Sequence, residues 1–173
     1  GLSGEDALSR AYAWDVRCFV DRTAVLPKAL LNTPATLHID SAVGPRTWHG
    51  IVSEVKQEEF TPRHRYFSLR IEPRVALLRL AARSEVYQDK SVIGVVQSLL
   101  AEHGFTETDS SLHLSETYAV QEYVVQHAES DWDFINRLLE DAGVTYFFEQ
   151  AGEFERLVLC DHPAGFPSYH PDR

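Results

Sequence analysis

One segment, residues 130–143, constrains the fold of this chain more than any other because it contains both ends of a helix. Ser130 can cap the first turn with its hydroxyl, and Gly143 supplies a left-handed stop. Asp131 and Asp133 place negative charge in the first turn, where the helix dipole favours it. The apolar residues recur at helical spacing, namely Trp132, Ile135, Leu139 and Ala142. The sequence therefore predicts an amphipathic helix with one buried face.

A second helix and three strands are predicted around the first. Ser91 can cap a helix over residues 92–103, which Gly104 would end. The Thr-, Asp- and Ser-rich residues 106–111 are predicted to form a loop. The predicted strands cover residues 118–126, 144–149 and 156–161, the last two as a hairpin.

Alternation of apolar and polar residues marks the first half of the chain as β structure. The predicted strands cover residues 12–20, 36–40, 47–55 and 65–72. The other predictions are a short helix over residues 25–31, a turn over 41–45 and an exposed polar segment over 58–64, while 75–80 cannot be assigned. Four or more strands with one short helix favour an antiparallel barrel or sandwich.

Charge divides the chain into two halves. Residues 1–83 contain 12 basic and 9 acidic side chains, whereas residues 84–173 contain 4 basic and 17 acidic ones. We therefore predict two domains with these limits. The difference favours contact between unlike modules and argues against nucleic-acid binding by the acidic half. Two solvated faces would explain the same numbers.

Apolar and sulfur-containing side chains give two further predictions. Tyr146, Phe147 and Phe148 place rings on both faces of one strand, which then needs cover from a partner surface or from an internal helix. Cys18 and Cys160 are the two cysteines, and both lie in apolar, alternating stretches. We expect Cys18 and Cys160 to be two buried thiols rather than a disulfide or a reactive site.

The sequence contains no familiar arrangement of catalytic, metal-binding or phosphate-binding residues. His-Glu-x-x-His, Cys-x-x-Cys, Gly-x-Ser-x-Gly and Gly-x-x-x-x-Gly-Lys are all absent. The acidic cluster at residues 127–131 is explained by a helix cap, and the basic residues 63–66 fit a solvated loop. Asp161, His162 and His170 would need a proline-rich tail to fold back before they could share a metal. We predict no enzyme, no cofactor and no metal.

The run from Tyr123 through the helix at 130–143 to residues 157–159 closely resembles the signature of VgrG proteins, the valine-glycine repeat spike proteins of type VI secretion systems. Other stretches match in the family's order, at residues 4–9, 34–37, 50–52 and 83–92. His127, Ala128 and Ala142 depart from the family pattern. The signature positions, to which the resemblance assigns a structural role, are Gln88, Asp89, Lys90, Ser91, Tyr123, Gln126, Glu129, Ser130, Asp131, Phe134, Arg137, Leu138, Leu139, Glu140, Gly143, Tyr146, Phe147 and Phe148.

The resemblance implies a fold and a role. The fold is mainly β (α+β), with two β-barrel or sandwich modules related to phage tail hub and Hcp tube domains, and a few short helices. The role is that of a structural needle-tip component, a trimeric hub that adapts the Hcp tube to a β-helical spike and carries effectors. The implied partners are further copies of the chain, the Hcp tube protein, baseplate components, and effector or adaptor proteins. The implied location is the cytoplasm during assembly, followed by expulsion to the exterior or into a target cell.

Three alternatives stay open. A tail hub of a contractile phage or tailocin would share the same physics. A cell-wall hydrolase effector would need convergent acid-base residues, and a module that binds a cargo or chaperone would fit an exposed segment at 58–64. Because the chain has no methionine and starts at Gly1, we expect an excised piece of a longer protein. No apolar run approaches the roughly 18 residues of a membrane span.

Overall fold

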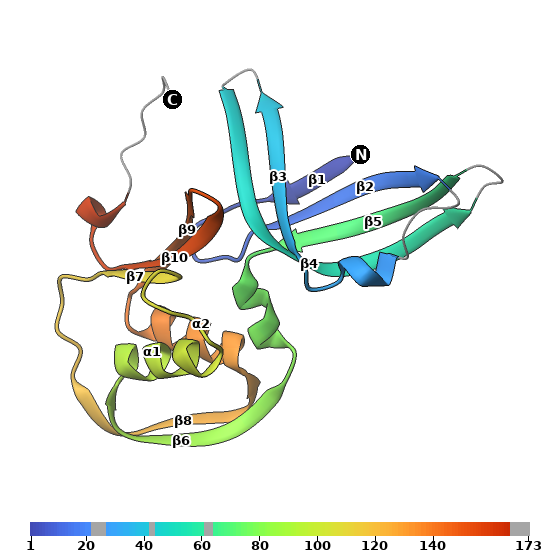
Figure 1. Cartoon of the computed structure of the whole chain (residues 1–173). Coiled ribbons are helices and arrows are strands. Elements are labelled where there is room, and N and C mark those ends of the chain that lie inside the picture. The colour runs from blue at the N-terminus through green and yellow to red at the C-terminus, as the bar shows by residue number, and fades with distance from the viewer. Residues whose placement is uncertain (22–26, 42–43, 61–63, 167–173) are drawn as a thin grey trace. The chain divides into compact units, whose positions relative to one another are not determined.

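The computed structural model describes residues 1–21, 27–41, 44–60 and 64–166 (Figure 1). The chain forms two compact units, one from Gly1–Ala76 with Gln150–Glu155 and one from Leu77–Glu149 with Arg156–Arg173. Counted over these units, the first has 10 basic and 11 acidic residues and the second has 6 and 15. The second unit is strongly acidic and the first is nearly neutral, so the positive sign of the first half depends on where its end is drawn. The domain limits 1–83 and 84–173 stay a prediction.

The first unit is built on a five-stranded antiparallel sheet in the order β1-β2-β5-β4-β3. Its strands are β1 (Leu2–Glu5), β2 (Ala13–Asp21), β3 (Pro34–Ser41), β4 (Gly44–Phe60) and β5 (His64–Glu72). The four predicted strands are all present. Strand β1 was not predicted, because all four of its residues are exposed and it lacks apolar alternation.

Strand β4 is longer than the sequence suggested. Pro45, in the predicted turn at 41–45, already belongs to the ladder with β3. Phe60, in the predicted exposed segment at 58–64, still pairs with Arg65 of β5. The predicted turn is therefore wrong at Pro45. The predicted exposure holds at Glu58, but β4 runs past the predicted strand end at residue 55. Two register shifts interrupt the β4–β5 ladder, and such bulges break the period-two pattern on which the strand prediction depends.

Four predictions extend outside the described residues. They are the start of the helix at 25–31, the centre of the turn at 41–45, the middle of the segment at 58–64, and His170. In the described part of the predicted helix at 25–31, Pro27–Leu30 forms a 3-10 helix, η1.

Tyr12 lies at the centre of the first unit's core. Its side chain is fully buried, and its hydroxyl donates a hydrogen bond to the carbonyl oxygen of His49. Gly50 follows directly, and a Cβ there would lie 2.4 Å from the carbonyl oxygen of Glu72 on β5. Only glycine therefore allows this close approach of the two backbones. The other large buried side chains of this core include Trp48, Ile51, Val52, Phe67 and Ile71.

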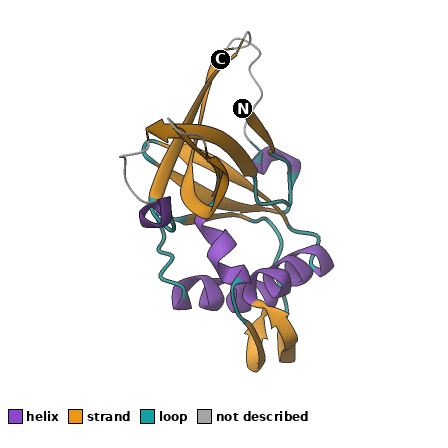
Figure 2. Ribbon diagram, turned by 90° about the vertical axis from the view of Figure 1, so that its right-hand side faces the viewer, coloured by secondary structure: helices purple, strands orange, loops and turns teal. Residues whose placement is uncertain are grey.

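The second unit combines two helices, a two-stranded ribbon and a three-stranded sheet. The 3-10 helix η2 (Arg74–Arg79) precedes the ribbon. The ribbon is the antiparallel pair β6 (Ala82–Ser91) and β8 (Val120–Ser130), and the sheet has the order β7-β10-β9. The remaining elements are α1 (Val92–Glu102), β7 (Ser110–His113), α2 (Asp131–Asp141), β9 (Thr145–Ala151), β10 (Phe154–Cys160) and η3 (Pro163–Gly165). Figure 2 shows the two helices over the ribbon.

Both helices begin at the predicted caps. The Ser91 hydroxyl accepts a hydrogen bond from the Gly94 amide, and the Ser130 hydroxyl accepts one from the Asp133 amide. The buried faces of the helices form the core of the second unit together. Its fully buried side chains include Val95, Val96 and Leu99 of α1 and Phe134, Ile135 and Leu139 of α2.

Three elements of the second unit differ from the prediction. Strand β6 was missed because its residues 84–90 are mostly polar and exposed. Strand β7 occupies part of the predicted loop at 106–111, where it pairs in parallel with β10. Strand β8 continues to Ser130 rather than ending at Gln126, because it pairs with β6 along its whole length. These strands are defined by distant partners, which local periodicity does not report.

The β9–β10 hairpin contributes to both units. Its base belongs to the second unit, while its tip, Gln150–Glu155, belongs to the first. The Gln150 Oε1 atom accepts a hydrogen bond of 2.7 Å from the His49 amide, and Glu155 Oε1 accepts one of 2.8 Å from the Arg74 amide. Two backbone donors of the first unit are thus satisfied by side chains from the far end of the sequence.

The aromatic rings of β9 are covered from within the chain. Tyr146 packs edge-on against Trp132 of α2 at a centroid distance of 5.3 Å. Phe147 lies 5.7 Å from Phe166, which follows η3. An internal helix thus supplies part of the cover.

The two cysteines are free thiols, but only Cys160 is buried, so the prediction of two buried thiols is wrong for Cys18.

Candidate assembly site

Two of the signature positions, Gln126 and Asp131, meet at the corner where the ribbon meets both helices. Asp131, the first residue of α2, is only 5% exposed. Its Oδ1 atom accepts hydrogen bonds from Arg83 Nε at 2.7 Å and from Gln126 Nε2 at 2.8 Å. Its Oδ2 atom lies 2.7 Å from His103 Nε2, at the end of α1. One carboxylate therefore connects β6, β8, α1 and α2.

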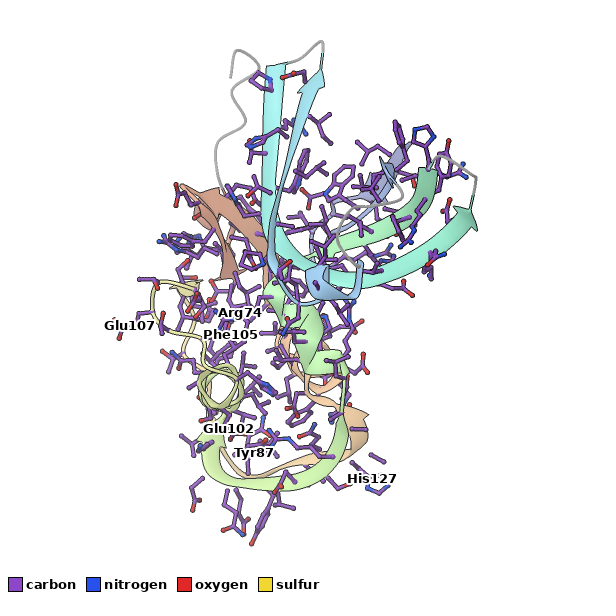
Figure 3. All side chains as sticks on the ribbon, turned by 45° about the vertical axis from the view of Figure 1, so that its right-hand side comes forward. Arg74, Tyr87, Glu102, Phe105, Glu107 and His127 are labelled. Atoms are coloured by element: carbon purple, nitrogen blue, oxygen red, sulfur yellow. The ribbon has the colours of Figure 1, made fainter. Side chains whose placement is uncertain are left out.

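The charge of Asp131 is stabilised by these contacts. Burial raises the pKa of its carboxyl, but the hydrogen bonds from His103, Gln126 and Arg83 outweigh burial and leave the pKa below the usual value. Arg83 also donates to Glu102 Oε2 of α1 at 2.8 Å. Figure 3 shows Glu102 and Tyr87 on the side of the ribbon that faces α1. The corner is a charged network in which both oxygens of Asp131 have partners, whereas the buried Gln126 Oε1 atom has no hydrogen-bond partner among the described residues.

Glu129 and Arg137 form a second connection between β8 and α2. Arg137 Nη2 lies 2.6 Å from Glu129 Oε1, and its Nε lies 3.3 Å from Oε2, so the contact is bidentate. The hydrogen bond from Arg137 lowers the pKa of Glu129. The same guanidinium donates to the carbonyl oxygen of Val125 and lies over the Phe134 ring. Arg137 therefore connects α2 to the strand that precedes it.

The other signature residues of the ribbon divide by orientation. Gln126 is 1% exposed, whereas Tyr123 is 55% exposed on the opposite face. Gln88 lies opposite Tyr123 in the ladder and is also exposed. Asp89 has a positive φ of 51°, and Lys90 Nζ donates to Ser98 Oγ of α1 at 2.8 Å. The sequence run of residues 88–91 thus ends β6 and ties it to α1.

The signature residues of α2 and β9 are structural in their contacts. Leu138 and Leu139 are buried, and Glu140 is exposed on the opposite side of the helix. Gly143 has a positive φ of 67°, as a helix stop requires. The Tyr146 hydroxyl donates to Asn136 Oδ1 at 2.7 Å.

Three members of the corner were not among the predicted site residues, namely Arg83, Glu102 and His103. They come from β6 and from the end of α1, 28 or more positions before Asp131. Arg83 begins the stretch at 83–92 that matches the VgrG family, whereas Glu102 and His103 lie outside every matching stretch. In the structure Arg83 lies opposite Glu129 in the β6–β8 ladder. Because β6 was not predicted as a strand, this register could not be inferred.

A second carboxylate anchors the loop that precedes β8. Asp161 accepts hydrogen bonds from the amides of Ser115 and Glu116 and from the hydroxyl of Tyr118. Partial desolvation raises the pKa of Asp161, but the hydrogen bonds from Glu116, Ser115 and Tyr118 outweigh it and set the pKa at about 2. The Asp161 carboxylate accepts hydrogen bonds from backbone amides, as aspartate side chains in turns commonly do.

Over residues 1–21, 27–41, 44–60 and 64–166, no group of three or more His, Cys, Asp and Glu side chains is arranged to hold a metal ion. Within these ranges there is also no helix long and apolar enough to cross a membrane. The candidate cluster at residues 127–131 consists of the end of β8, the cap of α2 at Ser130, and the carboxylates of Glu129 and Asp131 described above.

A profile of the phage tail baseplate hub (GPD) family matches residues 5–173. The chain belongs to this family. Its resemblance to VgrG proteins is also confirmed by relatives of the same kind. The type VI secretion system spike protein VgrG1c of Pseudomonas aeruginosa is 28% identical over 98% of this chain and 24% of the relative. VgrG5 of the same organism is 30% identical over 95% of this chain and 21% of the relative. The chain thus spans about a quarter of the length of these relatives.

Solved structures of phage tail and secretion proteins share this fold. The Escherichia coli c3393 protein is described as a type VI secretion component with structural similarity to the T4 tail proteins gp27 and gp5. It superposes with a TM-score of 0.88 at 26% identity, over 95% of this chain and 46% of that one. A 43 kDa tail protein of prophage MuSo2 from Shewanella oneidensis has a TM-score of 0.60 at 12% identity, over 87% of this chain and 45% of that one. The mainly β hub fold expected from the sequence is confirmed.

Proposed function

We propose that this chain is the hub region of a type VI secretion spike protein and that its role is structural. The observation that supports this most directly is the TM-score of 0.88 to the c3393 secretion component over 95% of the chain. The network around Asp131 is consistent with the proposal, because its hydrogen bonds fix two strands and two helices against one another. In the full-length protein, three copies form the hub at the tip of an Hcp tube.

This role implies the same partners and route as the resemblance. The hub contacts the Hcp tube, baseplate components, and effector or adaptor proteins, and it is assembled in the cytoplasm before it is expelled. The sequence suggested that a basic unit of one copy attracts the acidic unit of its neighbour in the trimer. The charges of the observed units give this attraction less support. By the observed units it would join a nearly neutral surface to an acidic one. Light scattering of the trimer over a range of salt concentrations measures this contribution.

Export of the tube protein tests the proposed role. In the parent spike protein of a secreting cell, we replace Asp131 by Asn and Leu139 by Asp, which removes the network charge and disrupts the helix core. Hcp is expected to disappear from the culture medium while cellular Hcp is retained. Glu140→Gln, at an exposed position of the same helix, is the control and should leave export intact. Normal export by the double variant contradicts a hub role, and loss of phage-tail or tailocin particles instead would assign the hub to that machine.

Catalysis is not proposed for this region. A cell-wall hydrolase needs a carboxyl that can donate a proton near neutral pH. Glu129 has both oxygens bound by Arg137 and a lowered pKa, so it is held ionised. We expect the chain and its Glu129→Gln variant to release equal, background amounts of product from peptidoglycan. Turnover by the chain that disappears in the variant would establish an enzyme.

A further inference from the structure

One face of the β3–β4 pair carries two neighbouring threonine–histidine pairs that the proposed hub role does not use. Thr36 lies opposite His49 in the ladder, and its Oγ1 atom lies 3.1 Å from His49 Nδ1. His38 lies opposite Thr47, and its Nδ1 atom lies 2.9 Å from Thr47 Oγ1. One histidine therefore comes from each of the two adjacent strands (Figure 1), at diagonal positions on the same face. We call His38 and His49 the histidine pair.

The tip of the β9–β10 hairpin lies beside the histidine pair. A cavity of about 520 Å³ is lined by the two threonine–histidine pairs together with Gln150, Gly152 and Glu153 of the tip. All of these residues belong to the first unit. Gln150 Oε1 accepts a hydrogen bond of 2.7 Å from the His49 amide. Among the described residues that line the cavity there is no lysine or arginine, so its charged side chain is the carboxylate of Glu153.

Each imidazole of the histidine pair uses one ring nitrogen for its threonine. The tautomer that donates Nδ1–H to the threonine oxygen leaves a lone pair on Nε2. Such a hydrogen bond from the second ring nitrogen is the usual arrangement of a metal-ligating histidine, because it fixes the tautomer and the ring orientation. Diagonal neighbours in an antiparallel sheet are about 7–8 Å apart, which two imidazoles can span with one ion between them.

We propose that His38 and His49 bind a divalent transition-metal ion of the Zn²⁺, Ni²⁺ or Cu²⁺ class through their Nε2 atoms. Imidazole nitrogen suits these ions, whereas Mg²⁺ and Ca²⁺ prefer oxygen ligands. The carboxylate of Glu153 on the same cavity favours a positive charge there. Since no three metal-ligating side chains are grouped within the described ranges, the site is an open one in which water completes the coordination. This inference does not depend on the identity of the secretion machine.

A metal titration tests the inference directly. Zn²⁺ alone is added to the isotope-labelled chain after treatment with a chelator, and amide NMR shifts are followed. We expect saturable shifts centred on residues 36–38 and 47–49, and no saturable shifts there with Mg²⁺. Cu²⁺ should bind more tightly than Zn²⁺. Because a bound ion stabilises the folded state, Zn²⁺ should also raise the temperature of unfolding of the chain.

Variants separate the histidine pair from its surroundings. His38→Gln removes one nitrogen ligand at an exposed position and should abolish saturable Zn²⁺ binding. Thr47→Val keeps the side-chain shape but removes the oxygen that orients His38, and it should weaken binding roughly tenfold. His127→Gln, at an exposed histidine of the second unit, is the matched control and should bind Zn²⁺ as the parent chain does. The exposed position of His38 keeps this test valid even if a variant of the buried His49 does not fold.

Four results would overturn the inference. They are the absence of saturable Zn²⁺ binding, equal binding of Mg²⁺, unchanged Zn²⁺ binding by the His38→Gln variant, and shifts centred on a different part of the chain. The last result would assign the ion to other ligands. None of the four bears on Hcp export, so this inference and the proposed hub role fail separately.

Discussion

Asp131 accepts a hydrogen bond from Arg83 at 2.7 Å across 48 residues of sequence, and this contact closes the corner of the second unit. The carboxylate is buried, whereas the side chain of Arg83 is 33% exposed. The pair therefore depends on the ionised carboxylate more than on the arginine, because the arginine can be solvated when the pair is broken.

Replacing Asp131 by Asn should lower the free energy of unfolding of the second unit by about 2–3 kcal/mol, because the amide removes the negative charge that pairs with Arg83 and exchanges one of the two acceptor oxygens for an NH2 group. Urea unfolding followed by helical circular dichroism measures the loss. Glu140→Gln, on the exposed side of the same helix, should stay within about 0.5 kcal/mol of the parent chain. Equal losses in both variants would show that the network contributes no more than surface charge does.

Acid should release the loop before β8. Asp161 has an ordinary pKa of 3.8 that is lowered to about 2 in the folded chain. A lowered pKa contributes stability that is complete above the ordinary value and is lost as the pH falls through the folded value. The amide shifts of Ser115 and Glu116 should therefore change as the pH falls from about 4 to about 2. In Asp161→Asn, the same amides should already have the released shifts at neutral pH.

The buried hydroxyl of Tyr12 should contribute more to the free energy of unfolding than an exposed tyrosine hydroxyl does. Tyr12→Phe leaves the His49 carbonyl oxygen without this donor inside the core, which should cost about 1–2 kcal/mol of the first unit's stability. Tyr123→Phe makes the same chemical change at a ring that is 55% exposed and should cost less than about 0.5 kcal/mol. Thermal unfolding of the two variants gives the comparison, and a reversed order contradicts the placement of Tyr12 at the core.

The cap of α2 should respond to the loss of its hydroxyl. Ser130→Ala removes the acceptor of the Asp133 amide and should cost about 1 kcal/mol. Ser130→Thr keeps a hydroxyl at that position and should recover most of the loss. Unfolding in urea measures both changes. If the threonine variant is as unstable as the alanine variant, side-chain volume rather than capping controls this position.

Local features of the sequence predicted the elements whose ends are chemically marked. Ser91 and Ser130 are caps in the structure, and the stop at Gly143 has the expected positive φ. The alternating strands of the first unit were also predicted. These signals work because they depend on neighbours in the chain.

Long-range pairing explains what the sequence did not predict. Strand β6 is polar and exposed, and only its partner β8 makes it a strand. Consequently Arg83, Glu102 and His103 were not associated with Asp131, although the signature already contained Asp131 and Gln126. The positions of the signature were predicted, but the network that connects them required the fold.

The shared hairpin determines the order in which this protein can be completed during synthesis. The amides of His49 and Arg74 donate hydrogen bonds to the side chains of Gln150 and Glu155. While the ribosome makes the intervening residues, the first unit therefore lacks its last segment, and most of the second unit is synthesised before it arrives. The five strands of the first sheet can pair early, but two amides of this unit stay without these side-chain acceptors until the hairpin near the other end of the chain has been made.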